Sequence, residues 1–544
     1  MAAQDVDYII VGGGLTGCTI ASRLKQCKQF SRIVLIEAGP NASDDTRTHT
    51  AMGAMTLGDS EYDWAYKTTP QTHLKDSIHT NAQGKVLGGG STTNYGGWLR
   101  GDASDYDAWG KIVQDKRWSY SGLLPYLRKP ERHSNASLSP QHGINGPMHV
   151  VSVTSSDPDR IYPLRDAVRE AWKEIGVEDN HHAIHGNVGG ISEFEENWRD
   201  GQRQPSHQAY PLKGVQILTN TMVQRVILSQ QSSDDNTGKV ITATGVELVN
   251  GTIIRAKEDV ILTAGAYRTP QLLMLSGIGP KDELETHNIT PVSLNEHVGI
   301  NLFDHFASFQ YWRLLYPLAL GSPALKHPAF AKGLPQDWVI RERFEDPGEL
   351  TDSALLHPAR QHIETIVVYA PAAARHAGVD APLDGYHIAT STMLLLPTSR
   401  GTITLSSAAI TDPPIIDPNY YSTAADKAIL IHGVERTRQA LLGTKAGKSF
   451  VEREVPPPNF SPLTTETSSD LIDERIQATG VSHSHAAGTA AMGKVVDTEL
   501  RVVGVKGLRV ADASVLPVAI GGHPQTTLYA LAEQAAEMIV GRRI

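Results

Sequence analysis

Residues 7–17 read Asp-Tyr-Ile-Ile-Val-Gly-Gly-Gly-Leu-Thr-Gly, and residues 32–37 read Arg-Ile-Val-Leu-Ile-Glu. The apolar runs at 7–11 and 32–37 each have the length of a short strand buried on both faces. The text between them, to about Gln26, places Ile20 and Leu24 on one helical face. The order strand, glycine turn, helix, strand predicts the start of a parallel α/β sheet.

The glycines in this turn match the requirements of a dinucleotide site one by one. Gly12 permits the tight turn, Gly14 lets the backbone approach a pyrophosphate, and Gly17 lets the helix pack on the strand. The N-terminus of the helix attracts phosphate charge. Glu37, twenty residues after Gly17, can accept hydrogen bonds from a ribose. The sequence therefore predicts a Rossmann-type dinucleotide site, and this turn alone does not distinguish NAD from FAD.

Composition excludes several classes of protein. The chain has 544 residues, which predicts two to four domains. Its net charge of −10 and its lack of basic runs argue against a nucleic-acid partner. Cys18 and Cys27 lie nine residues apart on the predicted helix, about 13 Å along its axis, too far for a disulfide. Two cysteines are also too few for a thiolate metal cluster.

We expect no secretory signal at the N-terminus. Met-Ala-Ala-Gln-Asp-Val-Asp has neither a basic region nor a cleavage site, and no apolar run approaches the roughly 18 residues of a membrane span. We expect a soluble, cytoplasmic protein without a membrane span.

Further blocks of sequence follow in a fixed order. They are Gly84–Asn94 (GKVLGGGSTTN) with Arg100-Gly101 and Asp105-Tyr106-Asp107-x-Trp109, then Gly265–Gly279, Val298–His305, His485–Gly493 and Gly507–Ser514. In these blocks, from end to end, the chain resembles the glucose–methanol–choline (GMC) flavin oxidoreductases.

The resemblance implies FAD as the cofactor, held noncovalently. Members that attach FAD through histidine carry it just before the asparagine of the first block, where this chain has Thr93. The residue after that asparagine is commonly glycine, and Tyr95 here would reshape access to the flavin. The expected FAD-binding residues are Gly12, Gly14, Leu15, Thr16, Gly17, Glu37, Ala38, Val86, Gly89, Ser91, Asn94, Val223 (through its backbone), Asp512, His523, Pro524 and Gln525.

The implied fold is α/β, with a Rossmann-like FAD-binding domain interleaved with a sheet-and-helix (α+β) substrate-binding domain. We expect residues 1–150, 211–305 and 478–544 in the FAD-binding domain, and 151–210 and 306–477 in the substrate-binding domain.

The sequence also predicts individual strands and helices outside the N-terminal strand–turn–helix unit. Strands are expected at 365–370, 386–395 and 402–405, and helices at 424–442 and from Pro524 to about Val540. The Pro- and charge-rich segment at 317–362 predicts irregular structure at the surface, which could form a lid or an oligomer contact. Residues 455–464 predict an extended connector.

Two histidines are the candidate catalytic groups. His485 and His523 lie in Gly/Ala-rich breaks, where small neighbours allow a bulky ring to approach. By resemblance, His485 is the general base, and His523 hydrogen-bonds the substrate alkoxide at a helix start whose dipole favours anionic reduced flavin. The alternative for each is a structural role, the interpretation preferred for His483 and His305.

No metal site is predicted from the sequence. His181, His182 and His185 lack carboxylate partners at a convincing spacing. Tyr95, Trp98, Tyr311 and Trp312 could line an aromatic pocket, although ordinary core packing is the preferred interpretation for each.

The leading functional hypothesis is FAD-dependent oxidation of a primary or secondary alcohol. A hydride passes to flavin N5, a histidine takes the hydroxyl proton, and the electrons go to O2 or another acceptor. The expected substrate is a small-molecule alcohol of intracellular or biosynthetic metabolism, and the oligomeric state is left open. The alternative is a redox-neutral flavoprotein lyase or cyclase using the same histidine pair.

Light-driven decarboxylation is disfavoured because it relies on a cysteine near the flavin, and both cysteines lie in the first helix region. The absence of G-x-S-x-G excludes a serine-hydrolase elbow.

Overall fold

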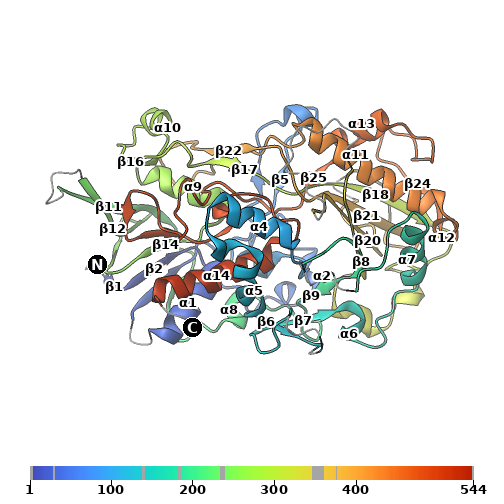
Figure 1. Cartoon of the computed structure of the whole chain (residues 1–544), viewed down its shortest axis with the longest axis horizontal. Helices are drawn as coiled ribbons and strands as arrows, with labels where there is room; N and C mark the ends of the chain where they lie inside the picture. Colours follow the sequence, from blue (N-terminus) through green and yellow to red (C-terminus); the bar gives the residue numbers. More distant parts are fainter. Residues whose placement is uncertain are drawn as a thin grey trace.

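A five-stranded parallel sheet contains the N-terminal strand–turn–helix unit (Figure 1). Its order is β10 (Gln216–Leu218), β3 (Ile33–Ile36), β2 (Tyr8–Val11), β14 (Val260–Leu262) and β27 (Leu508–Val510). Every pairing in it is parallel, with Ile9 between Val34 and Val260. The predicted strands at 7–11 and 32–37 are confirmed.

The computed structural model describes residues 4–28, 31–135, 137, 141–181, 183, 186–232, 239–345, 360–374 and 377–541.

Two helices from opposite ends of the chain pack together beside this sheet. They are α1 (Leu15–Cys27) and α14 (Pro524–Val540), and both match their predicted ranges. Arg23 of α1 forms a salt bridge of 2.7 Å with the fully buried Glu533 of α14. Cys18 and Cys27 are both free, as predicted from their separation.

A second five-stranded sheet lies at the same end of the molecule as the N-terminus (Figure 1). It contains β1 (Gln4–Val6), β13 (Ile253–Ala256), β12 (Lys239–Leu248), β11 (Val223–Ser232) and β26 (Val505–Lys506). Helix α9 (Gly265–Leu275), almost wholly buried, follows β14 directly.

A seven-stranded sheet forms the other end of the molecule (Figure 1). Its order is β24 (Val451–Val455), β18 (Phe306–Leu314), β21 (His387–Leu394), β20 (Ile363–Val368), β19 (Trp338–Glu342) and β8 (Gly190–Glu193), with β25 (Val481–Ser482) paired to β18. The predicted strands at 365–370 and 386–395 correspond to β20 and β21. The third, at 402–405, is β22 (Gly401–Thr404).

Two predictions in this half need correction. The text at 317–362 is not irregular throughout, because β19 forms within it by pairing with β20 and β8, while residues 346–359 lie outside the described residues. The helix predicted at 424–442 is α11 (Ala424–Arg438), and its last turn becomes a π-helical segment at Gln439–Gly443. After β24, residues 456–464 contain no helix or strand, as expected of a connector.

Shorter elements connect and cover the sheets. The helices are α2 (Ala51–Ala54), α3 (Gly90–Thr93), α4 (Ala103–Ile112), α5 (Tyr120–Arg128), α6 (Val153–Ser156), α7 (Arg165–Glu174), α8 (Ser206–Ala209), α10 (Lys281–Thr286), α12 (Lys445–Lys448) and α13 (Ser469–Thr479). The strands are β4 (Tyr66–Lys67), β5 (Thr80–Asn81), β6 (Glu131–His133), β7 (Met148–Ser152), β9 (Glu195–Glu196), β15 (Ile278–Gly279), β16 (Ser293–Leu294), β17 (Ile300–Leu302) and β23 (Ile415–Asp417).

The molecule is thus an α/β protein with a Rossmann-like sheet and a separate antiparallel sheet, each drawing on distant parts of the chain. One large apolar cluster surrounds the Rossmann-like sheet, and a second fills the seven-stranded end. The exact domain boundaries remain a prediction. Among the described residues, no helix is both long enough and apolar enough to cross a lipid bilayer.

Candidate active site

The glycine turn between β2 and α1 requires its glycines. Gly12 has a φ of +106°, and a Cβ there would lie 2.3 Å from the carbonyl oxygen of Thr263. A Cβ on Gly17 would lie 2.1 Å from the carbonyl oxygen of Gly12. Gly14 is the N-cap of α1 and supplies no side-chain cap. The backbone N–H groups that begin the helix, at Leu15, Thr16 and Gly17, are therefore left for a ligand, as phosphate binding requires.

Glu37 is fixed against this turn by two backbone donors. Its Oε2 accepts the N–H of Gly13 at 2.8 Å, and its Oε1 accepts the N–H of Gly39 at 2.7 Å. Burial raises the pKa of Glu37 to about 7, although these hydrogen bonds act in the opposite direction. The backbone oxygen of Glu37 also accepts the N–H of Thr221, which brings the segment before Val223 alongside.

The second glycine-rich segment, Gly84–Asn94, packs directly against the turn at Gly12–Gly17. The N–H of Gly88 donates to the carbonyl of Gly13 at 2.7 Å, and Gly89 lies so close to Gly14 that a Cβ would come within 2.8 Å of its Cα. Val86 is fully buried beside this contact. Ser91 is held in place by the backbone, since its hydroxyl donates to Gly88 and accepts the N–H of Ser206.

Asn94 joins this segment to the start of α14. Its Nδ2 donates to Oε1 of Gln525 at 3.1 Å, and its Oδ1 accepts Nη1 of Arg203 at 2.9 Å. Gln525 in turn donates to the carbonyl of Gly97. Helix α14 begins with Pro524 at its first turn and has no side-chain cap, so its N-terminal dipole is open to an anionic group.

The sequence did not single out Arg203. This side chain is buried, and its Nε and Nη2 have no hydrogen-bond partner among the described residues. Burial lowers its pKa to about 9. Buried donors of this kind fit a cofactor carbonyl or anion, since leaving them unpaired is unfavourable.

The two candidate catalytic histidines lie together, as predicted. The ring centroids of His485 and His523 are 5.2 Å apart, and both side chains stay partly exposed. Nδ1 of His485 lies 2.9 Å from Nδ1 of His305, so one of these two atoms carries a proton and donates it in a hydrogen bond to the other. Nε2 of His523 donates to Oε1 of Glu364 at 2.8 Å.

Electrostatics keep His485 neutral. Burial, reinforced by the neighbouring His305, His523 and His483, lowers the pKa of His485 well below its ordinary value. Burial likewise lowers the pKa of His305 to about 3 and that of His483 to about 4. A neutral imidazole retains a lone pair, as a general base must.

Glu364 was missed by sequence reasoning. Burial alone would raise its pKa, but the neighbouring His523 and Arg341 outweigh burial and hold the pKa far below its usual range. The sequence offered one signal, because Glu364 directly precedes an apolar run. The strand predicted at 365–370 began one residue too late to include it.

Asp304 positions the loop that carries His485. Its Oδ1 accepts the backbone N–H of His485 at 2.7 Å, and its Oδ2 accepts the hydroxyls of Tyr420 and Ser482. Burial raises the pKa of Asp304 to about 6. The Asp304-His305 pair therefore holds both the backbone and the ring of His485.

Comparison with known proteins identifies the family of this chain. The model of the N-terminal part of the GMC oxidoreductases matches residues 6–307, and that of the C-terminal part matches residues 397–532. The chain belongs to the GMC oxidoreductase family.

Individual GMC relatives cover nearly the whole chain. The GMC-type oxidoreductase acuG of Aspergillus aculeatus is 40% identical over 553 residues, which are 99% of this chain and 100% of the relative. The oxygen-dependent choline dehydrogenase of Brucella anthropi is 30% identical, with 99% and 96% covered. A structure concerned with FAD modification in Aspergillus oryzae formate oxidase is 28% identical with a TM-score of 0.88, over 98% of each chain. These similarities support FAD as the cofactor of this GMC oxidoreductase.

The side chain of Asp512 has a structural role that the sequence did not indicate. The carboxylate of Asp512 accepts the N–H of Gly265, the hydroxyl of Thr269 and the N–H of Ser514, which braces the start of α9. A cofactor contact by Asp512 would therefore involve its backbone, and that role stays a prediction, as does the backbone contact of Val223.

Core packing, the interpretation preferred for all four aromatic candidates, is confirmed for three of them and is wrong for Tyr95. Trp98, Tyr311 and Trp312 are at most 1% exposed and belong to apolar clusters, whereas Tyr95 is 56% exposed.

A possible metal cluster lies elsewhere than the sequence considered. His182 and His185 lie outside the described residues, and His181 joins no cluster within them. The group that the structure brings together is His133, His142 and Glu195, none of which the sequence singled out.

Proposed function

We propose that this GMC oxidoreductase oxidises a primary or secondary alcohol, with FAD held noncovalently. The observation that carries the proposal is His485 beside His523, with burial lowering the pKa of His485 and the uncapped start of α14 next to both rings. When bound, FAD accepts the hydride of the alcohol carbon at N5 and passes the two electrons to O2 or another acceptor. The choline dehydrogenase relative, named for an alcohol substrate, supports this class of donor.

The residues around the two glycine segments fit FAD. The uncapped N-terminus of α1, with Gly12, Gly14 and Gly17, would hold the pyrophosphate, and Glu37 with Ala38 the ribose. The segment from Val86 to Asn94 would cover the flavin. Thr93 supplies no nucleophilic imidazole, which supports noncovalent binding.

His485 would remove the hydroxyl proton of the substrate through Nε2. This requires that Nδ1 of His485 carries a proton and that Nδ1 of His305 accepts the hydrogen bond from it. Once His485 has accepted the substrate proton, the same hydrogen bond keeps its Nδ1–H paired. His305 thus serves as the acceptor that sets the tautomer of the base.

His523 would orient the substrate oxygen. Because Nε2 of His523 donates to the carboxylate of Glu364, Nδ1 is the ring nitrogen left for a substrate oxygen. Arg341 fixes Glu364 in turn, with Nε 2.9 Å from Oε2. Glu364 and Arg341 therefore act as positioning residues for His523.

A panel of primary and secondary alcohols tests the proposal under anaerobic conditions. Mixing the yellow holoenzyme with a substrate alcohol should bleach the flavin and release the matching aldehyde or ketone. Conversion of a substrate without bleaching and without an electron acceptor would instead establish the redox-neutral lyase or cyclase.

A further inference from the structure

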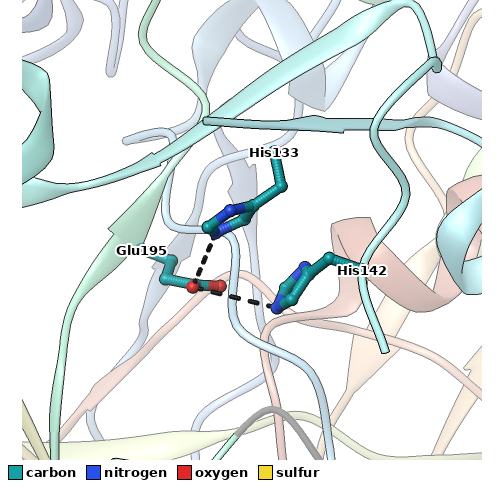
Figure 2. Close-up of side chains that lie close together, drawn as sticks. All are labelled: His133, His142 and Glu195. Atoms are coloured by element: carbon teal, nitrogen blue, oxygen red, sulfur yellow. Dashed lines mark hydrogen bonds and ion pairs between the residues drawn. The ribbon is translucent and has the colours of Figure 1, made fainter. Parts of the chain in front are cut away.

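Three buried side chains converge outside the His485–His523 pair. His133 ends β6, Glu195 begins β9, and His142 lies in the segment between β6 and β7. Figure 2 shows both imidazole rings turned toward the carboxylate of Glu195. One donor atom from each residue lies within 4.8 Å of the other two.

His142 presents a free lone pair to this cluster. Its Nδ1 lies 2.9 Å from Oε2 of Glu131, a carboxylate already paired with Arg100 at 2.6 Å. Nδ1 therefore donates to Glu131, and in the neutral ring this leaves Nε2 as the acceptor. Nε2 is buried, has no hydrogen-bond partner among the described residues, and faces Oε1 of Glu195 at 3.9 Å. Two electron-rich atoms facing each other in a buried site favour a cation between them.

A carboxylate behind an imidazole is also the usual support of a metal-binding histidine. Such a partner fixes the tautomer and the ring orientation and makes the opposite nitrogen more basic. Glu131 stands in that relation to His142, and it is itself fixed by Arg100, the indole N–H of Trp98 and the N–H of Gly143.

His133 contributes the third donor after one local rearrangement. Its Nε2 lies 3.0 Å from Oε1 of Glu195, and its Nδ1 accepts the backbone N–H of Asn135 at 3.0 Å. This is the tautomer expected without a metal. Metal binding at Nε2 transfers the ring proton to Nδ1, and the N–H of Asn135 must then turn away. Asn135 is exposed, so water can replace the lost acceptor.

We propose that His133, His142 and Glu195 bind a divalent transition-metal ion of the zinc type. Two imidazoles and one carboxylate are a ligand set that Zn2+ accepts, with bonds of about 2.0 Å. Tetrahedral bonds of that length separate neighbouring ligands by about 3.3 Å. The 3.0 Å and 3.9 Å separations from Glu195 bracket this value. The second oxygen of Glu195 or a water fills the fourth position.

The ion would brace the backbone beneath the candidate catalytic residues. The carbonyl of Glu195 accepts the N–H of Trp98 at 2.8 Å, and Glu196 pairs with Gly97. The carbonyl of Gly97 accepts the side chain of Gln525, at the start of α14. The ion is thus structural, and its ligands are separate from the His485–His523 pair.

Metal analysis of the untagged holoenzyme tests this proposal. The protein is stripped with EDTA, dialysed and titrated with Zn2+ by calorimetry, and with Co2+ by visible absorption. We expect one equivalent of Zn2+ to bind, and Co2+ to give the absorption bands of a site with nitrogen ligands. The variants His142→Ala and Glu195→Gln should each weaken binding by at least about 100-fold, while the exposed His181→Ala should bind as the wild type does.

FAD content serves as the folding control. Glu195→Gln keeps the size of the side chain and one oxygen that can accept the hydrogen bond from His133. The proposal is overturned if the stripped protein binds no Zn2+ tightly, or if a folded Glu195→Gln variant binds it unchanged. Neither result depends on whether an alcohol reduces the flavin, so the metal proposal and the proposed oxidation fail separately.

Discussion

The chemistry proposed for His485 depends on which of its ring nitrogens carries the proton. The 2.9 Å contact with Nδ1 of His305 allows either tautomer, but only donation by His485 leaves its Nε2 lone pair for the substrate. Deleting the acceptor removes that preference. We therefore predict that His305→Ala lowers the limiting rate of flavin reduction by about 10-fold or more, a typical share of a general base's contribution.

The measurement is rapid-mixing reduction of the variant under anaerobic conditions, with FAD content as the control. Unchanged FAD content and unchanged reduction would show that His305 has only a packing role.

The lowered pKa of His485 predicts the pH dependence of the same step. The base form is the neutral ring, and burial together with His305, His483 and His523 keeps it neutral to lower pH than an ordinary histidine with a pKa of about 6.5. The reduction rate at saturating alcohol should stay level from about pH 8 down to about pH 6 and fall only at more acidic pH. A tenfold change in rate per pH unit through pH 7 would contradict this.

At the scale of elements, the turn between β2 and α1 is the most constrained part of the cofactor site. A Cβ on Gly17 would lie 2.1 Å from a backbone oxygen, which neither strand nor helix can move easily. We predict that Gly17→Ala lowers the free energy of unfolding by about 1–3 kcal/mol and reduces bound FAD. Gly58→Ala is the matched control, because a Cβ there meets nothing within 4 Å. Thermal unfolding and the ratio of flavin to protein absorbance measure both effects.

The elements themselves show what the sequence could reveal. Strands β2 and β3 and helices α1 and α14 were predictable because their apolar runs, glycines and Pro524 act locally. Strand β19 was not, since the Pro- and charge-rich text around it becomes a strand only by pairing with β20 and β8. Glu364 and Arg203 were missed for a related reason: their partners His523 and Asn94 lie 159 and 109 residues away in the chain.

At the scale of the whole molecule, distant segments build one site. The predicted cofactor site combines the glycine turn, Asn94 and Gln525 of α14, while Glu364 and Arg341 come from the seven-stranded sheet at the other end. The blocks of sequence made the family and the histidine pair predictable. The positioning of that pair required the tertiary structure.

The way FAD is attached is also a property of the whole holoenzyme. Because Thr93 stands where covalent members carry histidine, acid precipitation should release the flavin into the supernatant and leave a colourless protein pellet. A yellow pellet that survives washing in denaturant would show a covalent bond and contradict the noncovalent assignment.

The central claim is that His485 removes the proton when an alcohol reduces the flavin. Its most direct test is anaerobic rapid mixing of a substrate alcohol with wild-type holoenzyme and with His485→Ala, following the loss of flavin absorbance. We predict that the variant keeps its FAD and reduces about 10²–10⁴-fold more slowly, as expected for loss of a general base. A variant that retains FAD and reduces within a few-fold of the wild-type rate would contradict the account.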